Sequence, residues 1–328
     1  MYQFEINPNE AGQRFDKYLH KLLPEAPSSF FYKMLRKKNI VLNGKKTEGK
    51  EKLSVGDQVS LFLSDETFAL FQGEKRNEDE YRKAFHTMTD ITVIYENTNM
   101  LLVNKPAGIL SQKARDTDFS VNEWLIGYLL SKREITESSL TTFRPSVCNR
   151  LDRNTSGLVI CAKTLYGSQQ LGTMIRERSV HKFYRLFVKG HIEKEEMLEG
   201  YLTKNELTNK VTISKSVSVD ASYIKTRYYP LEKFSDMTYL EVELITGKTH
   251  QIRAHMASVG HPLLMDYKYG DKKFNDSYKS SLKASGQLLH AYRLEFPADE
   301  PLLEGKEHIF VAPEPAVFQK ILQTKQSL

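Results

Sequence analysis

The sequence has little cysteine and no long apolar run. Its two cysteines in 328 residues, Cys148 and Cys161, are too few for a disulfide framework. No apolar stretch approaches the roughly 18 residues that a membrane-spanning helix needs, and the polar start MYQFEINPNE lacks the apolar core of a signal peptide. Neither GxGxxG nor GxxxxGKS/T occurs, which argues against a dinucleotide site or a P-loop. We therefore expect a cytoplasmic protein without membrane contact.

Positive charge is present in excess. The chain carries 47 Lys and Arg against 41 Asp and Glu, a net charge of +6, and 40% of its residues are hydrophobic, enough for a packed core. The excess is uneven, because residues 1–62 hold 11 Lys and Arg against 7 Asp and Glu, a local charge of +4. A basic balance of this kind favours a polyanionic partner.

Residues 1–63 have the pattern of a small module of two helices and a hairpin. Four apolar residues at helical spacing predict the first helix; they are Phe15, Tyr18, Leu19 and Leu22. A second helix, with Ser28 or Ser29 as its N-cap, is predicted to run into a basic cluster, RKK. The stretch IVLNGKK then predicts a strand and an Asn43-Gly44 hairpin turn, and GDQVSLFL predicts a later strand.

This module resembles the alpha-L RNA-binding module, which is named after the fourth small-subunit ribosomal protein. The similarity lies in the helix pair, in RKKNIVLNGKK and in the later VGDQV. The alternative is a small domain whose lysines are merely solvated. Because the basic residues gather at one helix end and beside the hairpin turn, we predict RNA binding. The expected RNA-binding residues are Arg14, Lys17, Lys33, Arg36, Lys37, Asn43 and Lys45, together with Arg150 further along the chain.

The rest of the chain is divided into a linker and a second domain. Residues 64–89 are dense in mixed charge and are expected to be the linker, and residues 90–328 are expected to form the second domain. ITVIYENTNMLLVNKPAGILSQ predicts a hairpin, and GLVICAK, KFYRLFVKG and TYLEVELIT predict strands. VNEWLIGYLLSK, GSQQLGTMIRER and THQIRAHMASVG predict helices. This mixture predicts an α+β fold with a mixed, largely antiparallel sheet.

One acid stands out by its surroundings. The segment NRLDRNTSGLVICAKT places Asp152 between Arg150 and Arg153, at the entrance of a predicted buried strand. A lone acid beside arginines is commonly a structural salt bridge, but a loop acid at the end of a sheet is also rigidly mounted where sites are built. The later segment LITGKTHQIRAHMASVGHPLLMDYKYG supplies Arg253 on a predicted helix. We expect Arg253 to pair with Asp152 and keep it ionised, as a nucleophile or base must be.

The same later segment contains three histidines, which raises the alternative of a zinc site. His250 and His255 are five residues apart rather than four, so they do not share a helical face as paired zinc ligands would. No Glu stands between them, and the third histidine, His261, follows a glycine beyond the helix. We therefore expect no metal.

The two segments resemble signature motifs of the RluA-type pseudouridine synthases. LVNKPAGIL, KFYRLFVKG and LLHAYRLEF fall in the order of that family, and the similarity runs from about residue 90 to the end. The resemblance implies an isomerase that converts uridine in RNA to pseudouridine without a cofactor or a metal. It implies that Asp152 is the catalytic aspartate, that Tyr184 stacks on the base and handles its proton, and that Arg253 pairs with the aspartate.

Three questions stay open at this point. Asn149 stands where the family usually has His, so it is open whether the reaction requires an imidazole at that position. Tyr184 alternates with Leu186 and Val188 on its predicted strand, so a core role competes with the catalytic one. The carboxylate has two possible tasks, covalent attack on the nucleotide or removal of a sugar proton.

The substrate expected from the resemblance is large-subunit ribosomal RNA, because YKYGDKKFND resembles the subgroup that modifies it. Transfer RNA is the alternative substrate. An RNA-binding ribosome-assembly factor with an inactive synthase domain is a second class, which a missing Asp, Tyr or Arg would favour, and all three are present. A glycoside hydrolase would need a second acid across the site, and none stands out. We expect a monomer.

Overall fold

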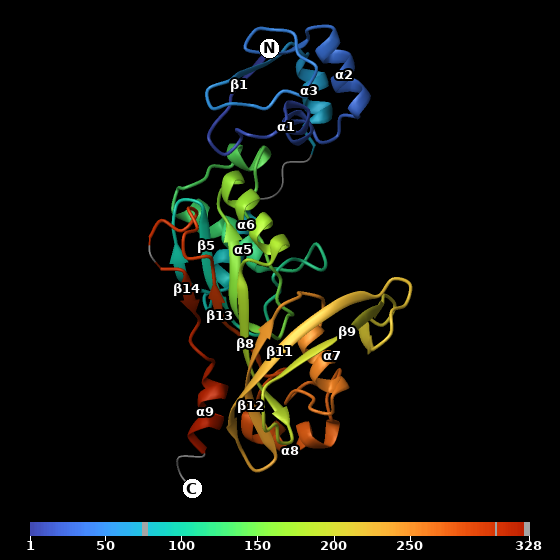
Figure 1. The fold of residues 1–328 in the computed structure, drawn as a ribbon. Helices are drawn as coiled ribbons and strands as arrows, with labels where there is room; N and C mark the ends of the chain where they lie inside the picture. Colours follow the sequence, from blue (N-terminus) through green and yellow to red (C-terminus); the bar gives the residue numbers. More distant parts are fainter. Residues whose placement is uncertain (74–77, 306, 325–328) are drawn as a thin grey trace. The chain divides into compact units, whose positions relative to one another are not determined.

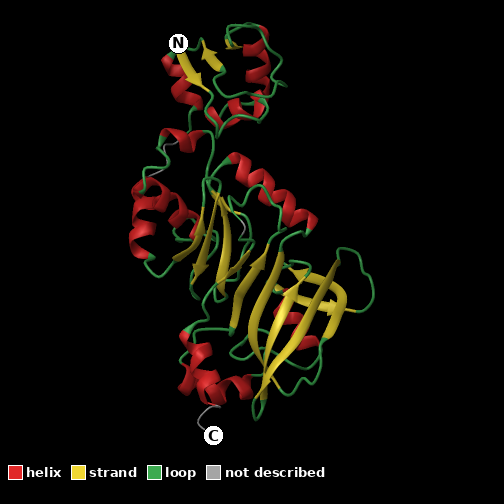
Figure 2. Cartoon of the chain, turned by 60° about the vertical axis from the view of Figure 1, so that its left-hand side comes forward, coloured by secondary structure: helices red, strands yellow, loops and turns green. Residues whose placement is uncertain are grey.

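The computed structural model describes residues 1–73, 78–305 and 307–324 (Figure 1). Figure 2 shows its helices and strands. The chain falls into two units, and the first comprises Met1–Thr87, Glu123–Ser146 and Ala162–Gln169. The second comprises Met88–Asn122, Val147–Cys161 and the described residues from Gln170 onward. The predicted boundaries at residues 63 and 89 stay a prediction, and residues 74–77 of the expected linker lie outside the described residues.

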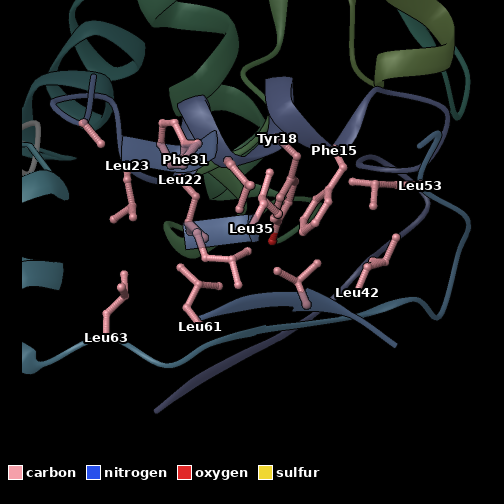
Figure 3. Close-up of a cluster of buried hydrophobic side chains, with 14 of the residues drawn as sticks. Phe15, Tyr18, Leu22, Leu23, Phe31, Leu35, Leu42, Leu53, Leu61 and Leu63 are labelled. Atoms are coloured by element: carbon pink, nitrogen blue, oxygen red, sulfur yellow. The ribbon is translucent and has the colours of Figure 1, made fainter. Parts of the chain in front are cut away.

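The beginning of the first unit is a small antiparallel sheet covered by helices. Its strands are β1 (Tyr2–Glu5), β2 (Ile40–Leu42) and β3 (Gln58–Leu61), in the order β1-β3-β2. The helices that pack on it are α1 (Phe15–Leu22), α2 (Ser28–Arg36) and α3 (Asp65–Phe71), and α4 (Glu78–Thr87) follows them in the chain. The four apolar residues predicted at helical spacing are all buried in α1. They share one core with Phe31 and Leu35 of α2 and with Leu61 of β3 (Figure 3).

Two local predictions in this unit have different outcomes. Asn43 and Gly44 have φ angles of 51° and 70°, and Leu42 and Lys45 exchange backbone hydrogen bonds of 3.2 and 2.9 Å, so the two-residue hairpin turn is confirmed. The predicted serine N-cap of α2 is wrong. The N-cap is Pro27, whose extended conformation leads directly into the helix, and no side chain caps it.

A mixed sheet runs through the second unit (Figure 2). Among the described residues its order is β10-β9-β11-β12-β8-β13-β7-β5-β4, with β14 on β13 and β6 on β7. The bounds are β4 (Thr92–Glu96), β5 (Met100–Lys105), β6 (Ser146–Val147), β7 (Ser156–Ala162), β8 (His181–Lys189), β9 (Glu196–Asn205), β10 (Lys210–Ser214), β11 (Ser222–Lys233), β12 (Met237–Leu244), β13 (Leu289–Glu295) and β14 (Ile309–Val311). Antiparallel pairs dominate, while β13 and β7 are parallel. The predicted α+β fold with a mixed, largely antiparallel sheet is confirmed.

The remaining helices are divided between the two units, and those that follow β12 belong to the second unit. The helices that follow α4 are α5 (Val121–Ser131), the 3-10 helix η1 (Ser138–Thr141), α6 (Leu165–Glu177), α7 (Gln251–Ser258), α8 (Lys272–Leu282) and α9 (Ala316–Thr324). Ala254 of α7 packs against Leu202, Val211 and Ile224 of β9, β10 and β11. This packing fixes the helix that carries Arg253. None of the described helices is long and apolar enough to cross a membrane.

Gly157 allows the parallel strands β7 and β13 to approach closely. It pairs with Ala291 and has a φ of 109°, and a Cβ at this position would lie 2.2 Å from the Ala291 carbonyl oxygen. Only glycine fits both demands. Beside it, the Ser156 hydroxyl lies 2.9 Å from Nδ1 of the fully buried His290. These contacts fix the start of β7, directly after the loop that carries Asp152.

Candidate active site

Asp152 lies on the loop between β6 and β7, and its neighbours fix that loop. The Thr155 N–H donates to the Asp152 carbonyl at 3.0 Å and closes a tight turn. The Ser111 hydroxyl accepts from the Leu151 N–H at 2.9 Å and lies 3.1 Å from the Leu151 carbonyl. The acid is therefore mounted on a backbone that is held from both sides.

Asn149, at the position where the family usually has His, holds the same loop against β7. Its side-chain oxygen accepts the backbone N–H of Ile160 at 2.7 Å. The Cys148 N–H donates to the Ile160 carbonyl, also at 2.7 Å. The amide oxygen of Asn149 makes this structural contact, so an imidazole is not needed at this position.

Lys105, which sequence reasoning missed, ties the Asp152 loop to the end of β5. Its side chain is fully buried, and Nζ donates to the carbonyls of Pro106 at 3.0 Å, Ile109 at 2.8 Å and Arg153 at 3.1 Å. Three acceptors match the three donors of an ammonium group. Burial lowers the pKa of Lys105 to about 7, although the nearby Asp152 charge acts in the opposite direction. The signal in the sequence is a lysine that closes an apolar strand, in LLVNKP.

Arg253 contacts two carboxylates. Its Nη1 donates to Asp152 Oδ2 at 2.8 Å, while Nε and Nη2 donate to the two oxygens of Asp266 at 2.7 and 2.9 Å. Burial opposes the charge of Arg253, but the hydrogen bonds and charges of Asp266 and Asp152 raise its pKa above the ordinary value. For Asp266, burial is outweighed by Arg253 and by two backbone N–H groups, so its pKa is lowered. Asp266 therefore holds one edge of the guanidinium in place, and Nη1 donates to Asp152.

His250 completes the surroundings of Asp152. It is the N-cap residue before α7 and has a φ of 54°, and its Nε2 lies 3.9 Å from Asp152 Oδ2. Its Nδ1 lies 2.9 Å from the hydroxyl of Tyr269, whose ring is 5.1 Å from the Arg253 guanidinium. Burial lowers the pKa of His250, with Asp152 opposing, so the imidazole is neutral at pH 7.

The other two histidines of this segment have different neighbours. His255 lies 3.0 Å from the Thr226 hydroxyl, and His261 lies 2.9 Å from the Lys189 carbonyl. In the part of the chain that the structure describes, no group of three His, Cys, Asp or Glu side chains could hold a metal ion.

Tyr184 of β8 lines the same cavity as Asp152. Its side chain is 6% exposed, whereas Leu186 and Val188, further along the same face, are fully buried. Among the described residues its hydroxyl has no hydrogen-bond partner. Burial, and then the charge of Asp152, raises the pKa of Tyr184, so the phenol keeps its proton at neutral pH. This face of β8 therefore packs in the apolar core at Leu186 and Val188, and it lines the cavity at Tyr184.

The cavity around Asp152 has a volume of about 780 Å³ and a basic lining. Asp152 is the single carboxylate among its lining residues, all of which lie in described parts of the second unit. Asp266 is 1% exposed and does not line it. The lining cations are Lys113, Arg150, Arg153, Arg178, Lys182, Lys204, Lys248 and Arg253. Such a wall concentrates polyanions, and the volume suits a nucleotide-sized group.

The other predicted RNA-binding residues lie in the first unit. All of them are exposed: Arg14, Lys17, Lys33, Arg36, Lys37, Asn43 and Lys45. Arg14 pairs with Asp16 at 2.6 Å, and the Asn43 amide donates to Asp57 at 2.8 Å, so both have partners within the protein. Sequence reasoning missed Tyr32, which is 56% exposed and shares a face of α2 with Arg36, one turn along the helix.

Replacing Arg253 by lysine is expected to lower turnover about ten- to a hundredfold. Lysine keeps the charge but is a point donor, so it loses the simultaneous contact with two carboxylates. A charged hydrogen bond contributes about 1.5–3 kcal/mol, which corresponds to that range of rates. Single-turnover rates and RNA affinity, measured side by side, should show a loss of rate with affinity retained.

Arg293→Lys is the matched control, because Arg293 also contacts two carboxylates, Glu241 and Glu295, away from the cavity. It should leave the rate unchanged. An Arg253→Lys enzyme that turns over as fast as this control would show that the pairing with Asp152 is incidental.

Comparison with known proteins identifies the family of the chain. Residues 99–258 match the family described as RNA pseudouridylate synthase. "Ribosomal large subunit pseudouridine synthase C" of Vibrio cholerae is 30% identical over 308 residues, which cover 92% of this chain and 90% of that protein. The protein of the same name in Escherichia coli is 29% identical over 293 residues, which cover 89% of this chain and 87% of that protein.

Solved structures agree at the level of the fold. One is titled "Human RNA Pseudouridylate Synthase Domain Containing 4" and superimposes with a TM-score of 0.58 at 20% identity. The match covers 75% of this chain and 97% of that chain. The human domain-containing 1 structure gives a TM-score of 0.51 at 19% identity, with 78% and 97% covered. The resemblance to RluA-type enzymes is thereby confirmed, and the chain belongs to the RNA pseudouridylate synthase family of isomerases.

Proposed function

We propose that this enzyme converts uridines of large-subunit ribosomal RNA to pseudouridine, and that Asp152 is the residue that acts on the target nucleotide. The observation that carries the proposal is a single carboxylate, bound by Arg253, in an otherwise cationic cavity beside Tyr184. The names of the Vibrio and Escherichia relatives support the choice of RNA. No second acid lines the cavity, which disfavours a paired-carboxylate glycosidase.

The chemistry is an isomerisation. The bond between N1 and C1′ breaks, the bond between C5 and C1′ forms, C5 loses a proton and N1 gains one. Asp152 either attacks the nucleotide covalently or removes a sugar proton, and both tasks need an ionised carboxylate in a fixed position, which Arg253 supplies. A uridine that enters the cavity must leave its stack, at a cost of a few kcal/mol. The Tyr184 ring and the cations of the cavity offset this cost by stacking and by holding phosphates.

The proposal is tested by mapping pseudouridines in total RNA from a strain that lacks the gene. We expect one or more sites in large-subunit ribosomal RNA to disappear and to return when the wild-type gene is restored. Sites lost from transfer RNA would move the enzyme to that substrate. Restoration by an Asp152→Asn gene would favour the alternative in which the protein acts as a ribosome-assembly factor without catalysis.

We further propose that residues 1–63 anchor the RNA. The support is the exposed part of α2, where Tyr32 lies one turn from the cation Arg36 and next in sequence to Lys33, and the basic end of that helix at Lys37. Aromatic rings stack on unpaired bases and cations bind phosphates. A cytosolic monomer remains our expectation, and Cys148 and Cys161, which form no disulfide, agree with a reducing compartment.

Neutralising three of these cations, Lys33→Gln, Arg36→Gln and Lys37→Gln, should weaken RNA binding and leave the rate at saturating RNA unchanged. Each lost phosphate contact should flatten the log–log dependence of affinity on salt by about 0.7–0.9. The control neutralises Lys272, Lys273 and Lys279, which are exposed on α8. If RNA affinity depends on salt concentration with the same slope in both triple variants, α2 does not anchor the RNA.

A further inference from the structure

Lys182 is a buried cation in the active-site cavity to which the proposed chemistry gives no specific task. It lies on β8 two residues before Tyr184, so the two side chains are on one face of the strand, separated by about 6.5 Å along it. Lys182 is 8% exposed and lines the cavity together with Tyr184 and Asp152.

No acid compensates this charge. Within the described residues, Lys182 has neither a hydrogen-bond nor an ion-pair partner. The charged group that acts on it is another cation, Arg178, which also lines the cavity. Burial, and then Arg178, lowers the pKa of Lys182, so both act against its ammonium form. A buried cation beside a second cation is costly in the free protein, which is reasonable where a ligand brings the missing anion.

The other buried cations near Asp152 differ in this respect. Lys105 has three carbonyl acceptors, and Arg253 has two carboxylates. Lys182 and Arg178 have no such partners, and both face the cavity. Their position relative to Tyr184 also fits a nucleotide. If the base stacks on the Tyr184 ring, Lys182 is displaced from it by about the width of a ribose, where the backbone of the same nucleotide passes.

We propose that Lys182 and Arg178 form a subsite that binds a backbone phosphate next to the target uridine. This inference rests on the proposed function, because it takes the base to lie at Tyr184. A lysine supplies a point charge to one phosphate oxygen, and an arginine beside it supplies parallel donors to others. Lys182 would then position the nucleotide, and Asp152 would act on it.

The test compares Lys182→Met, Lys182→Arg and Lys194→Met on a transcript of large-subunit ribosomal RNA. Methionine keeps much of the length and removes the charge, and arginine keeps the charge. Lys194 is an exposed lysine between β8 and β9, outside the cavity, so its replacement controls for net charge. RNA affinity is measured at several salt concentrations. The single-turnover rate is measured at saturating RNA, and the melting temperature is measured without RNA.

For Lys182→Met we expect about tenfold weaker binding and a salt slope flatter by about 0.7, with the saturated rate within about threefold of wild type. The melting temperature should stay equal or rise, because an uncompensated buried charge has gone. Lys182→Arg and Lys194→Met should bind like wild type.

Unchanged affinity and slope in Lys182→Met would overturn the subsite, and so would a saturated rate that collapses while affinity is retained. A loss of melting temperature in Lys182→Met with normal RNA binding would reduce Lys182 to packing. If wild type makes no pseudouridine on this transcript, the proposed substrate fails, whereas the affinities and slopes still decide the subsite.

Discussion

An Asp152→Asn enzyme is expected to form no measurable pseudouridine, a loss of at least about a thousandfold, while it folds and binds RNA normally. Asparagine keeps the size of the side chain and can still accept from Arg253 Nη1, but it has neither the negative charge of a nucleophile nor the basicity of a proton acceptor. No other carboxylate lines the cavity to take its place. The guanidinium of Arg253 keeps its two bonds to Asp266, so the substitution leaves no unpaired buried charge.

This result is checked with purified protein on the cognate RNA, by single-turnover assay and by binding. Asp299→Asn is the matched control, since it makes the same change at an exposed loop residue outside the cavity. The control should match wild type in rate. Product formation by Asp152→Asn at more than a trace would assign the chemistry to another group.

Tyr184→Phe is expected to bind RNA like wild type and to react about a hundred- to ten-thousandfold more slowly, the usual contribution of a group that handles a proton. Phenylalanine keeps the ring for stacking and removes only the hydroxyl. Because that hydroxyl has no partner within the described protein, its loss should change the melting temperature little.

Tyr228→Phe is the opposite case and serves as the control. Tyr228 is as buried as Tyr184, but its hydroxyl donates to Glu196 at 2.6 Å, away from the cavity. Its replacement should cost about 1.5–3 kcal/mol of stability and leave the rate unchanged. If Tyr184→Phe instead reacts at full speed, Tyr184 serves in packing or stacking alone.

Local patterns allowed much of the fold to be predicted. The helix at residues 15–22 was predicted because four apolar residues at helical spacing all face one core. The strand Ser156–Ala162 was predicted because its run of apolar residues is buried on both faces. The predicted helix over THQIRAHMASVG is found as Gln251–Ser258, and it begins after His250, whose positive φ no pattern indicates.

The parts that were missed depend on contacts between distant residues. β9 contains three charged residues, Glu196, Glu199 and Lys204, so its composition gives a weak strand signal. Its pairing with β10 and β11 creates the strand. Asp266 was visible in the segment MDYKYG, but nothing local indicates that it binds Arg253 bidentately. The three acceptors of Lys105 likewise become visible only when the loops meet in space.

The position of β13 has a consequence for how the enzyme matures on the ribosome. β13 lies between β8 and β7 in the middle of the sheet, yet it comes more than a hundred residues later in the chain than β8. Until Leu289–Glu295 have left the exit tunnel, the strand that joins β7 to β8 is missing. Tyr184 and the loop of Asp152 are then not held on one sheet. Such non-local pairing makes folding slow. A nascent chain would therefore lack an assembled catalytic cavity until β13 is in place, and catalysis would begin only after translation is nearly complete.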